Sequence, residues 1–297
     1  MTAERYTAAT DLVERYAAAF SSAVPDHPGD DGFYGPGSVT WRLAADLSAP
    51  VAGLRSVLMQ ALHPLAMAGV DQHSDWRRDP VGRLAATSSY TATVTYGDRA
   101  SVRRAARRVR AIHEHVRGVD TVTGRPYAAG DPALLLWVHA ALVDSVLAAS
   151  RLFGTPPQHA DADKFVGEMA VSVELLGVPR EIIPAGVAAL ERYITGVRPD
   201  LRCTPAAAQS MGYMLDPAGM GEEIAELWQE IRDAAVAALP EWARDMYGYP
   251  APPAITPGRR TEIRQTLGVF DTVFLAEPGV LEARQRLTLR MRSAHPG

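Results

Sequence analysis

The chain has 297 residues, 47% of them hydrophobic, which is enough to bury one large core or two small ones. Its formal net charge of −4 and its isoelectric point near 6.1 exclude a general electrostatic attraction to nucleic acid or to anionic lipid. Its single cysteine, Cys203, excludes an internal disulfide framework and a cysteine-rich zinc or iron–sulfur site. One cysteine also fits a reducing compartment.

The sequence gives no sign of export or of a membrane span. Residues 1–20 carry several charged side chains and lack the apolar centre of a secretory signal. The most apolar stretch, residues 134–149, is interrupted by His139 and Asp144 and is shorter than the ~20 residues that cross a bilayer. We therefore expect a soluble, cytoplasmic protein without stable membrane insertion. The sequence is compatible with both a monomer and a homodimer.

Apolar residues recur at helical spacing along most of the chain. The expected helices cover residues 10–23, 49–62, 80–94, 98–117, 132–153, 160–176, 179–195, 205–211, 221–239, 258–274 and 278–292. Residues 25–39 are dense in proline, glycine and aspartate, which predicts a loop. Pro64 should end or kink the helix before it, and Gly118 should stop the helix that precedes it. Only residues 90–96 look strand-like, and a helix end fits them equally well.

This pattern predicts an all-α fold, with one large helical domain over residues 1–297 and no internal repeat. The proline-rich residues 249–257 resemble a rigid connector. We therefore expect a C-terminal helical appendage over residues 250–297.

Two histidines lie on apolar stripes of expected helices. His113 continues the stripe of Val102, Ala106 and Val109, whereas His115 points elsewhere and should be solvated. His139 falls on the stripe of the 132–153 helix. A buried imidazole must be hydrogen-bonded, metal-bound or neutral, and a single one is more often a core residue than a ligand. Two on neighbouring helices favour a site, but spacing alone leaves both interpretations open.

Arginines surround His113 in the sequence. Arg110 precedes it by three residues and Arg117 follows it by four, so both can flank the same helix face. Such a helix can offer an imidazole to haem iron and cations to the two propionates. The alternative is that these arginines belong to the basic run of residues 99–110, most of which should be a solvated face. The run has no interleaved aromatic residues, which argues against nucleic-acid binding.

Arg83 and Thr87 are one turn apart on the 80–94 helix, so both could meet a ligand. An ordinary surface arginine and a threonine bonded to its own backbone explain the spacing better. The sequence holds no His-Glu-x-x-His zinc motif, Gly-x-Ser-x-Gly elbow or Walker loop.

Three blocks carry a family resemblance: LHPLAMAGVDQHSDWRRDPVGRLAAT, RRVRAIHEHVRG and GRPYAAGDPALLLWVHAALVDS. In order and spacing they resemble the haem-dependent MpaB-like oxygenases, which share their catalytic domain with the latex-clearing proteins, or rubber oxygenases. The resemblance is best over residues 40–200 and fades towards both ends. It implies an all-helical fold with a haem pocket between the central helices, a b-type haem, and dioxygen chemistry.

The resemblance also implies roles for particular residues. His113 matches the proximal iron ligand, with Arg110 and Arg117 in the family's Arg-x-x-His-x-x-x-Arg motif. Arg83 and Thr87 match the distal Arg…Thr pair. His139 matches a further histidine that lies near the haem without binding iron. His63 and His73, in the block before the distal helix, are expected pocket residues.

The chain departs from the rubber-cleaving members at one position. Their distal lysine precedes the threonine, whereas here Ala86 precedes Thr87. This argues against polyisoprene as substrate, as does the absence of a secretion signal. We expect a haem b oxygenase or oxidase that uses dioxygen or peroxide on a small, largely apolar molecule. A non-catalytic haem carrier or gas sensor, and a haem-free or non-haem iron relative, are the alternatives.

Overall fold

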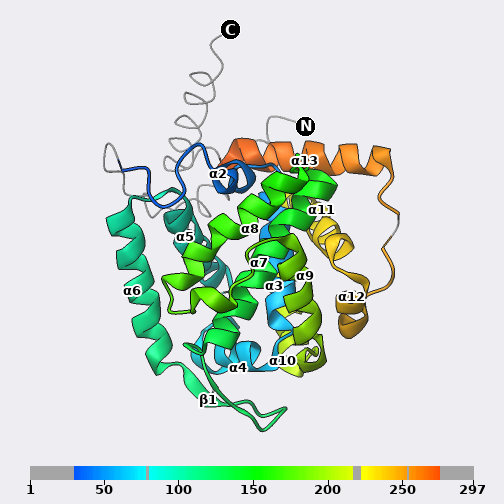
Figure 1. Cartoon of the computed structure of the whole chain (residues 1–297). Helices are drawn as coiled ribbons and strands as arrows, with labels where there is room; N and C mark the ends of the chain where they lie inside the picture. Colours follow the sequence, from blue (N-terminus) through cyan, green and yellow to red (C-terminus); the bar gives the residue numbers. More distant parts are fainter. Residues whose placement is uncertain (1–29, 78–79, 217–221, 253, 275–297) are drawn as a thin grey trace.

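The computed structural model of the chain describes residues 30–77, 80–216, 222–252 and 254–274. Almost all regular structure in these residues is helical, which confirms the predicted all-α fold (Figure 1). The helices are α2 (Val39–Ala44), α3 (Ala49–Ala61), α4 (Pro64–His73), α5 (Pro80–Tyr96), α6 (Arg99–His115), α7 (Pro132–Phe153), α8 (His159–Glu174), α9 (Val187–Val197), α10 (Pro205–Leu215), α11 (Glu222–Ala238), α12 (Glu241–Tyr247) and α13 (Pro257–Phe274). The strands β1 (Arg117–Val119) and β2 (Pro126–Ala128) form a small antiparallel hairpin.

Helix α7 lies near the middle of the bundle and packs along α3 (Figure 1). It begins where the sequence predicts, because Asp131 Oδ1 accepts a hydrogen bond from Ala133 N at 2.8 Å and Pro132 occupies the first helical position. Leu58 of α3, Trp137 of α7 and Ile231 of α11 belong to the largest core cluster and are almost fully buried. These helices form the centre of the bundle, and α7 carries one of the predicted site residues, His139.

Within the described part of the chain, α7 is the one helix long and apolar enough to span a membrane by length and composition. Of its most apolar window, 67% is buried inside the protein. The core helix of a soluble protein passes the same test, so this is weak evidence for a span.

Several predicted boundaries are wrong for local reasons. Pro64 ends α3 as expected but also begins α4, a helix that the sequence pattern did not predict. Residues 90–96 are the helical end of α5. The predicted 179–195 helix is instead a 3₁₀ turn, Arg180–Ile182, followed by α9, because Pro184 lacks an N–H and Gly186 is extended.

The C-terminal part of the described chain shares the main core. Ile263 and Leu267 of α13 are buried in the same cluster as α3 and α7. Helix α12, which was not predicted, lies between α11 and the connector over residues 249–256. The predicted helices over residues 10–23 and 278–292 lie outside the described residues, and the division at residue 250 stays a prediction.

Candidate functional site

Helix α6, which carries His113, is the most amphipathic element of the site. Asp98 caps its start, accepting from Ser101 N at 2.9 Å. Val102 and Ala106 are buried, and His113 is half-buried further along the same face. His115 is exposed and its Nδ1 lies 2.9 Å from the Ala111 carbonyl oxygen, so the predicted difference between the two histidines is confirmed.

The basic residues of α6 form its solvent-facing side, as the sequence predicts. The exposed ones are Arg99, Arg103, Arg104, Arg107, Arg108 and Arg110. Figure 1 shows α6 at the edge of the bundle beside α5, and the two helices pack together. The face that carries His113 is thus the half-buried one.

The prediction that Arg117 belongs to the α6 helix is wrong. The helix ends at His115, Val116 is extended, and Arg117 pairs with Ala128 in the hairpin. Gly118 follows in the same strand, where a Cβ would lie 2.8 Å from Tyr127 Oη, so a larger residue would require the tyrosine side chain to shift. Arg117 is exposed, and its Nε donates to the Glu114 carbonyl oxygen at 3.0 Å.

The hairpin is held to α4 by a polar network. Tyr127 Oη donates to Gln72 Oε1 at 2.8 Å, and His73 Nε2 lies 3.1 Å from the same hydroxyl. Gln72 Nε2 in turn donates to the Val119 carbonyl oxygen at 3.0 Å. These contacts fix the chain where it leaves α6. They place His73 beside the hairpin, and its role in a haem pocket stays a prediction.

Helix α5 carries the second pair of predicted residues. Thr87 is exposed, and the side chain of Arg83 lies outside the described part. Thr91 Oγ1 donates to the Thr87 carbonyl oxygen at 3.0 Å, a bond typical of helix threonines. Because α5 packs on α6, Arg83, Thr87 and His113 come from neighbouring helices.

His139 of α7 is buried, as its apolar stripe predicts, with 7% of its surface exposed. Its Nδ1 lies 3.2 Å from Ser172 Oγ on α8, and that hydroxyl also donates to the Met169 carbonyl oxygen at 2.7 Å. Burial lowers the pKa of His139 to about 4, so the ring is neutral at neutral pH. A neutral imidazole in this position is a hydrogen-bonding group and carries no charge.

Two enclosed tyrosine hydroxyls lie near Ser172 and on α5. Tyr34 Oη is enclosed near Ser172, and Tyr90 Oη is enclosed on α5 close enough to interact electrostatically with Tyr34. Neither hydroxyl makes a hydrogen bond of good geometry within the described residues. Burial raises the pKa of both, that of Tyr90 to about 12. This cluster has no signature in the sequence, because its members are far apart in the chain.

Glu168 fixes the segment that contains Tyr34. Its Oε2 accepts hydrogen bonds from Thr40 N and Thr40 Oγ1, both at 2.8 Å, at the start of α2. A carboxylate at a helix N-terminus is stabilised by the unpaired N–H groups there. The loop before α2 is thereby attached to α8, one turn from Ser172.

His63 lies on a different side of α7 from His139. It is buried, its ring is 6.3 Å from that of Trp137, and its Nδ1 has no partner within the described residues. Trp137 and His139 are two residues apart, hence about 200° apart around the helix. Burial, and to a lesser extent Arg125, lower the pKa of His63. The two imidazoles are therefore not brought together, and a pocket role for His63 stays a prediction.

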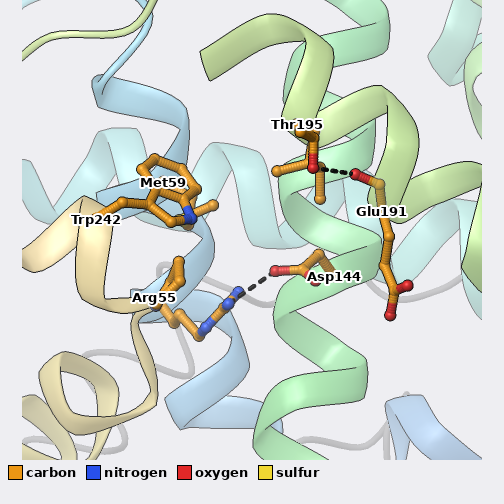
Figure 2. Close-up of a pocket in the computed structure, with 8 residues that line it drawn as sticks. Arg55, Met59, Asp144, Glu191, Thr195 and Trp242 are labelled. Atoms are coloured by element: carbon orange, nitrogen blue, oxygen red, sulfur yellow. Dashed lines mark hydrogen bonds and ion pairs between the residues drawn. The ribbon is translucent and has the colours of Figure 1, made fainter.

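A cavity of about 170 Å³ opens between α3, α7, α9 and α12, lined in part by Arg55, Asp144, Glu191 and Trp242 (Figure 2). Asp144 is about 140° around α7 from His139, so this cavity is on another face. Its volume is below the roughly 300–1,000 Å³ typical of organic-ligand pockets. Figure 2 shows Asp144 paired with Arg55 across it. We interpret the cavity as the surroundings of a structural ion pair.

Acid is expected to destabilise the protein through His139. Between pH 6.5 and about 4 the unfolded chain holds a proton on this ring that the folded protein lacks. The free energy of unfolding should therefore fall as pH drops through this window, by at most about 3 kcal/mol from this residue. Urea unfolding at pH 7 and pH 5 measures the effect. His139→Gln should flatten the dependence, whereas the exposed-face control His115→Gln should not; equal slopes in all three proteins would contradict the assignment.

The comparisons with known proteins give one family match. A family model described as "ER-bound oxygenase mpaB/B'/Rubber oxygenase, catalytic domain" matches residues 41–272. The match runs from α2 to α13 and extends beyond residues 40–200, where the resemblance is best. Searches among curated proteins and among solved structures gave no significant match. Because the matched span covers well over half of the chain and includes α5, α6 and α7, the protein belongs to the MpaB-type and rubber oxygenase catalytic-domain family.

Proposed function

We propose that the protein is a haem b-dependent oxygenase that acts with dioxygen or peroxide on a small, largely apolar organic molecule. The observation that carries the proposal is the position of His113, half-buried on the apolar face of α6 beside α5. Membership of an oxygenase family supports the reaction class. The haem and the kind of substrate are our inference.

The donor set of the described residues suits a haem better than a protein-only metal site. No group of three or more His, Cys, Asp or Glu side chains in the described chain could hold a metal ion. A porphyrin supplies four nitrogen ligands itself, so one imidazole completes a proximal side. The hydroxyls of Tyr34 and Tyr90 are enclosed and make no hydrogen bond of good geometry within the described residues, which also fits a site that a ligand fills, since unpaired buried polar groups are costly. This favours a haem over a non-haem iron site.

Each residue has a distinct part in the proposal. His113 would bind the iron, and the exposed guanidiniums of Arg110 and Arg117 would pair with the two propionates. The haem supplies the redox chemistry of dioxygen activation. Arg83 and Thr87 would offer hydrogen bonds on the distal side, and the neutral ring of His139 would add an acceptor.

Oxygen consumption distinguishes this proposal from a haem carrier or gas sensor. Protein purified from haem-supplied cells is incubated with a reductant and a panel of small apolar compounds, and dissolved oxygen is followed with an electrode. The proposal expects uptake that depends on one class of compound and yields an oxygenated product. A protein that keeps its haem, consumes no oxygen with any compound and forms no product with peroxide would support the alternative of a haem carrier or gas sensor.

Arg83→Ala is expected to retain haem and to lose most of the substrate oxidation. A cationic donor near developing negative charge in a dry pocket contributes ~3 kcal/mol, so the rate should fall on the order of a hundredfold. Haem content and turnover are measured in the same preparation, with the exposed-face variant Arg107→Ala as control. Because Ala86 stands where the rubber-cleaving members have a distal lysine, added imidazole should also bind the ferric protein. Full activity in Arg83→Ala would contradict the distal role.

A further inference from the structure

We propose that Ser172 is a positioning residue that fixes His139 as its Nδ1–H tautomer, so that Nε2 acts as a hydrogen-bond acceptor in the site. The inference rests on the proposed function for what the site contains, and on contacts between α7 and α8 for its geometry. It assigns a role to a residue that neither the motifs nor the sequence pattern singled out.

The tautomer follows from the single proton of the Ser172 hydroxyl. Ser172 Oγ lies 2.7 Å from the Met169 carbonyl oxygen, which can only accept, so the hydroxyl donates there. Towards His139 Nδ1, 3.2 Å away, the same oxygen is then an acceptor. Nδ1 must therefore carry the proton, and Nε2 of the neutral ring is left with a lone pair.

The second nitrogen of His139 has no hydrogen-bond partner among the described residues. His139 Nε2 makes no hydrogen bond in the described residues, although His139 keeps only 7% of its surface exposed. A polar atom in such surroundings must find its partner in water or in a ligand. The partner has to be a donor, either water in the resting protein or an O–H or N–H group of a bound molecule.

The surroundings hold this arrangement in place. Ser172 is one turn from Glu168, whose carboxylate is fixed by the start of α2, and Tyr34 Oη is enclosed beside Ser172. The Ser172 oxygen has a second lone pair, which the Tyr34 hydroxyl can approach. Three elements thus converge on one hydroxyl, and its orientation decides which nitrogen of the imidazole carries the proton.

Long-range proton–nitrogen NMR of histidine-labelled, full-length protein tests the tautomer directly. Any haem is kept diamagnetic by reduction and carbon monoxide, and His139→Gln assigns the signal. The expected spectrum shows a neutral ring protonated on Nδ1. Ser172→Ala should shift the tautomer ratio towards Nε2–H by about fivefold, the ordinary value of one hydrogen bond. Ser172→Thr, which keeps the hydroxyl, should restore the original ratio.

Ser150→Ala is the matched control, because Ser150 is also a buried helix serine that donates to a carbonyl three residues earlier but makes no hydrogen bond with a histidine among the described residues. It should leave the His139 signal unchanged. A wild-type ring protonated on Nε2, or an unchanged ratio in Ser172→Ala, would overturn the proposal. Haem absorbance in the same samples keeps the two proposals separate, since wild-type protein without haem but with the expected tautomer would contradict only the proposed function.

Discussion

Replacing Arg55 by methionine is expected to lower the free energy of unfolding by about 3 kcal/mol, out of the roughly 5–15 kcal/mol typical of a folded domain. The guanidinium is almost fully buried and donates to three groups, Asp144 Oδ2 at 2.7 Å, Ser145 Oγ at 2.6 Å and the Ala238 carbonyl oxygen at 2.8 Å. The last of these lies at the C-terminal end of α11, where a cation is favoured. Methionine has no hydrogen-bond donor, so Asp144, Ser145 and the Ala238 carbonyl would each lose the hydrogen bond that they accept from Arg55.

The controls separate the ion pair from the general effect of removing an arginine. Arg42 forms an ion pair with Asp161 whose side chains are 49% and 36% exposed, so Arg42→Met should cost less than about 1 kcal/mol. Arg55→Met combined with Asp144→Leu should recover part of the loss, because the uncompensated carboxylate is removed. Denaturant unfolding followed by circular dichroism measures all four proteins. Equal effects of Arg55→Met and Arg42→Met would contradict a structural role for the buried pair.

Features set by neighbouring residues could be predicted from the sequence. The starts and the apolar stripes of α6 and α7 depend on positions within one or two turns, and the structure has them within one residue of where they are expected. The burial of His139 and the exposure of His115 follow from the same periodicity. Helix faces were therefore predictable, even though their partners across the fold were not.

Features set by distant residues could not be predicted. Three-residue strands are too short for a periodic signal, and after α6 ends the chain pairs Arg117 and Gly118 with Ala128 and Tyr127 of the opposite strand. Arg117 was consequently assigned to a helix. The contact of Ser172 with His139 joins residues 33 positions apart, and that of Arg55 with Asp144 joins residues 89 apart. Nothing in the local pattern indicates either pair.

Loss of haem from His113→Ala is the largest effect expected on function. The imidazole would be the bond from the protein to the iron, and without it only contacts to the propionates and the apolar walls would hold the porphyrin. His115 is two residues further along α6, about 200° away, and its ring lies against its own helix backbone. His115→Ala removes an imidazole from the same turn without touching the site, which makes it the matched control.

The haem content per chain of these two variants tests the central claim most directly. Wild type, His113→Ala and His115→Ala are expressed in haem-supplied cells, purified in parallel, and assayed by the Soret band and by the pyridine haemochrome spectrum. The account predicts about one haem b per chain in wild type and His115→Ala, and almost none in a His113→Ala protein that remains folded by circular dichroism. A colourless wild-type protein, or equal haem content in both variants, would contradict it.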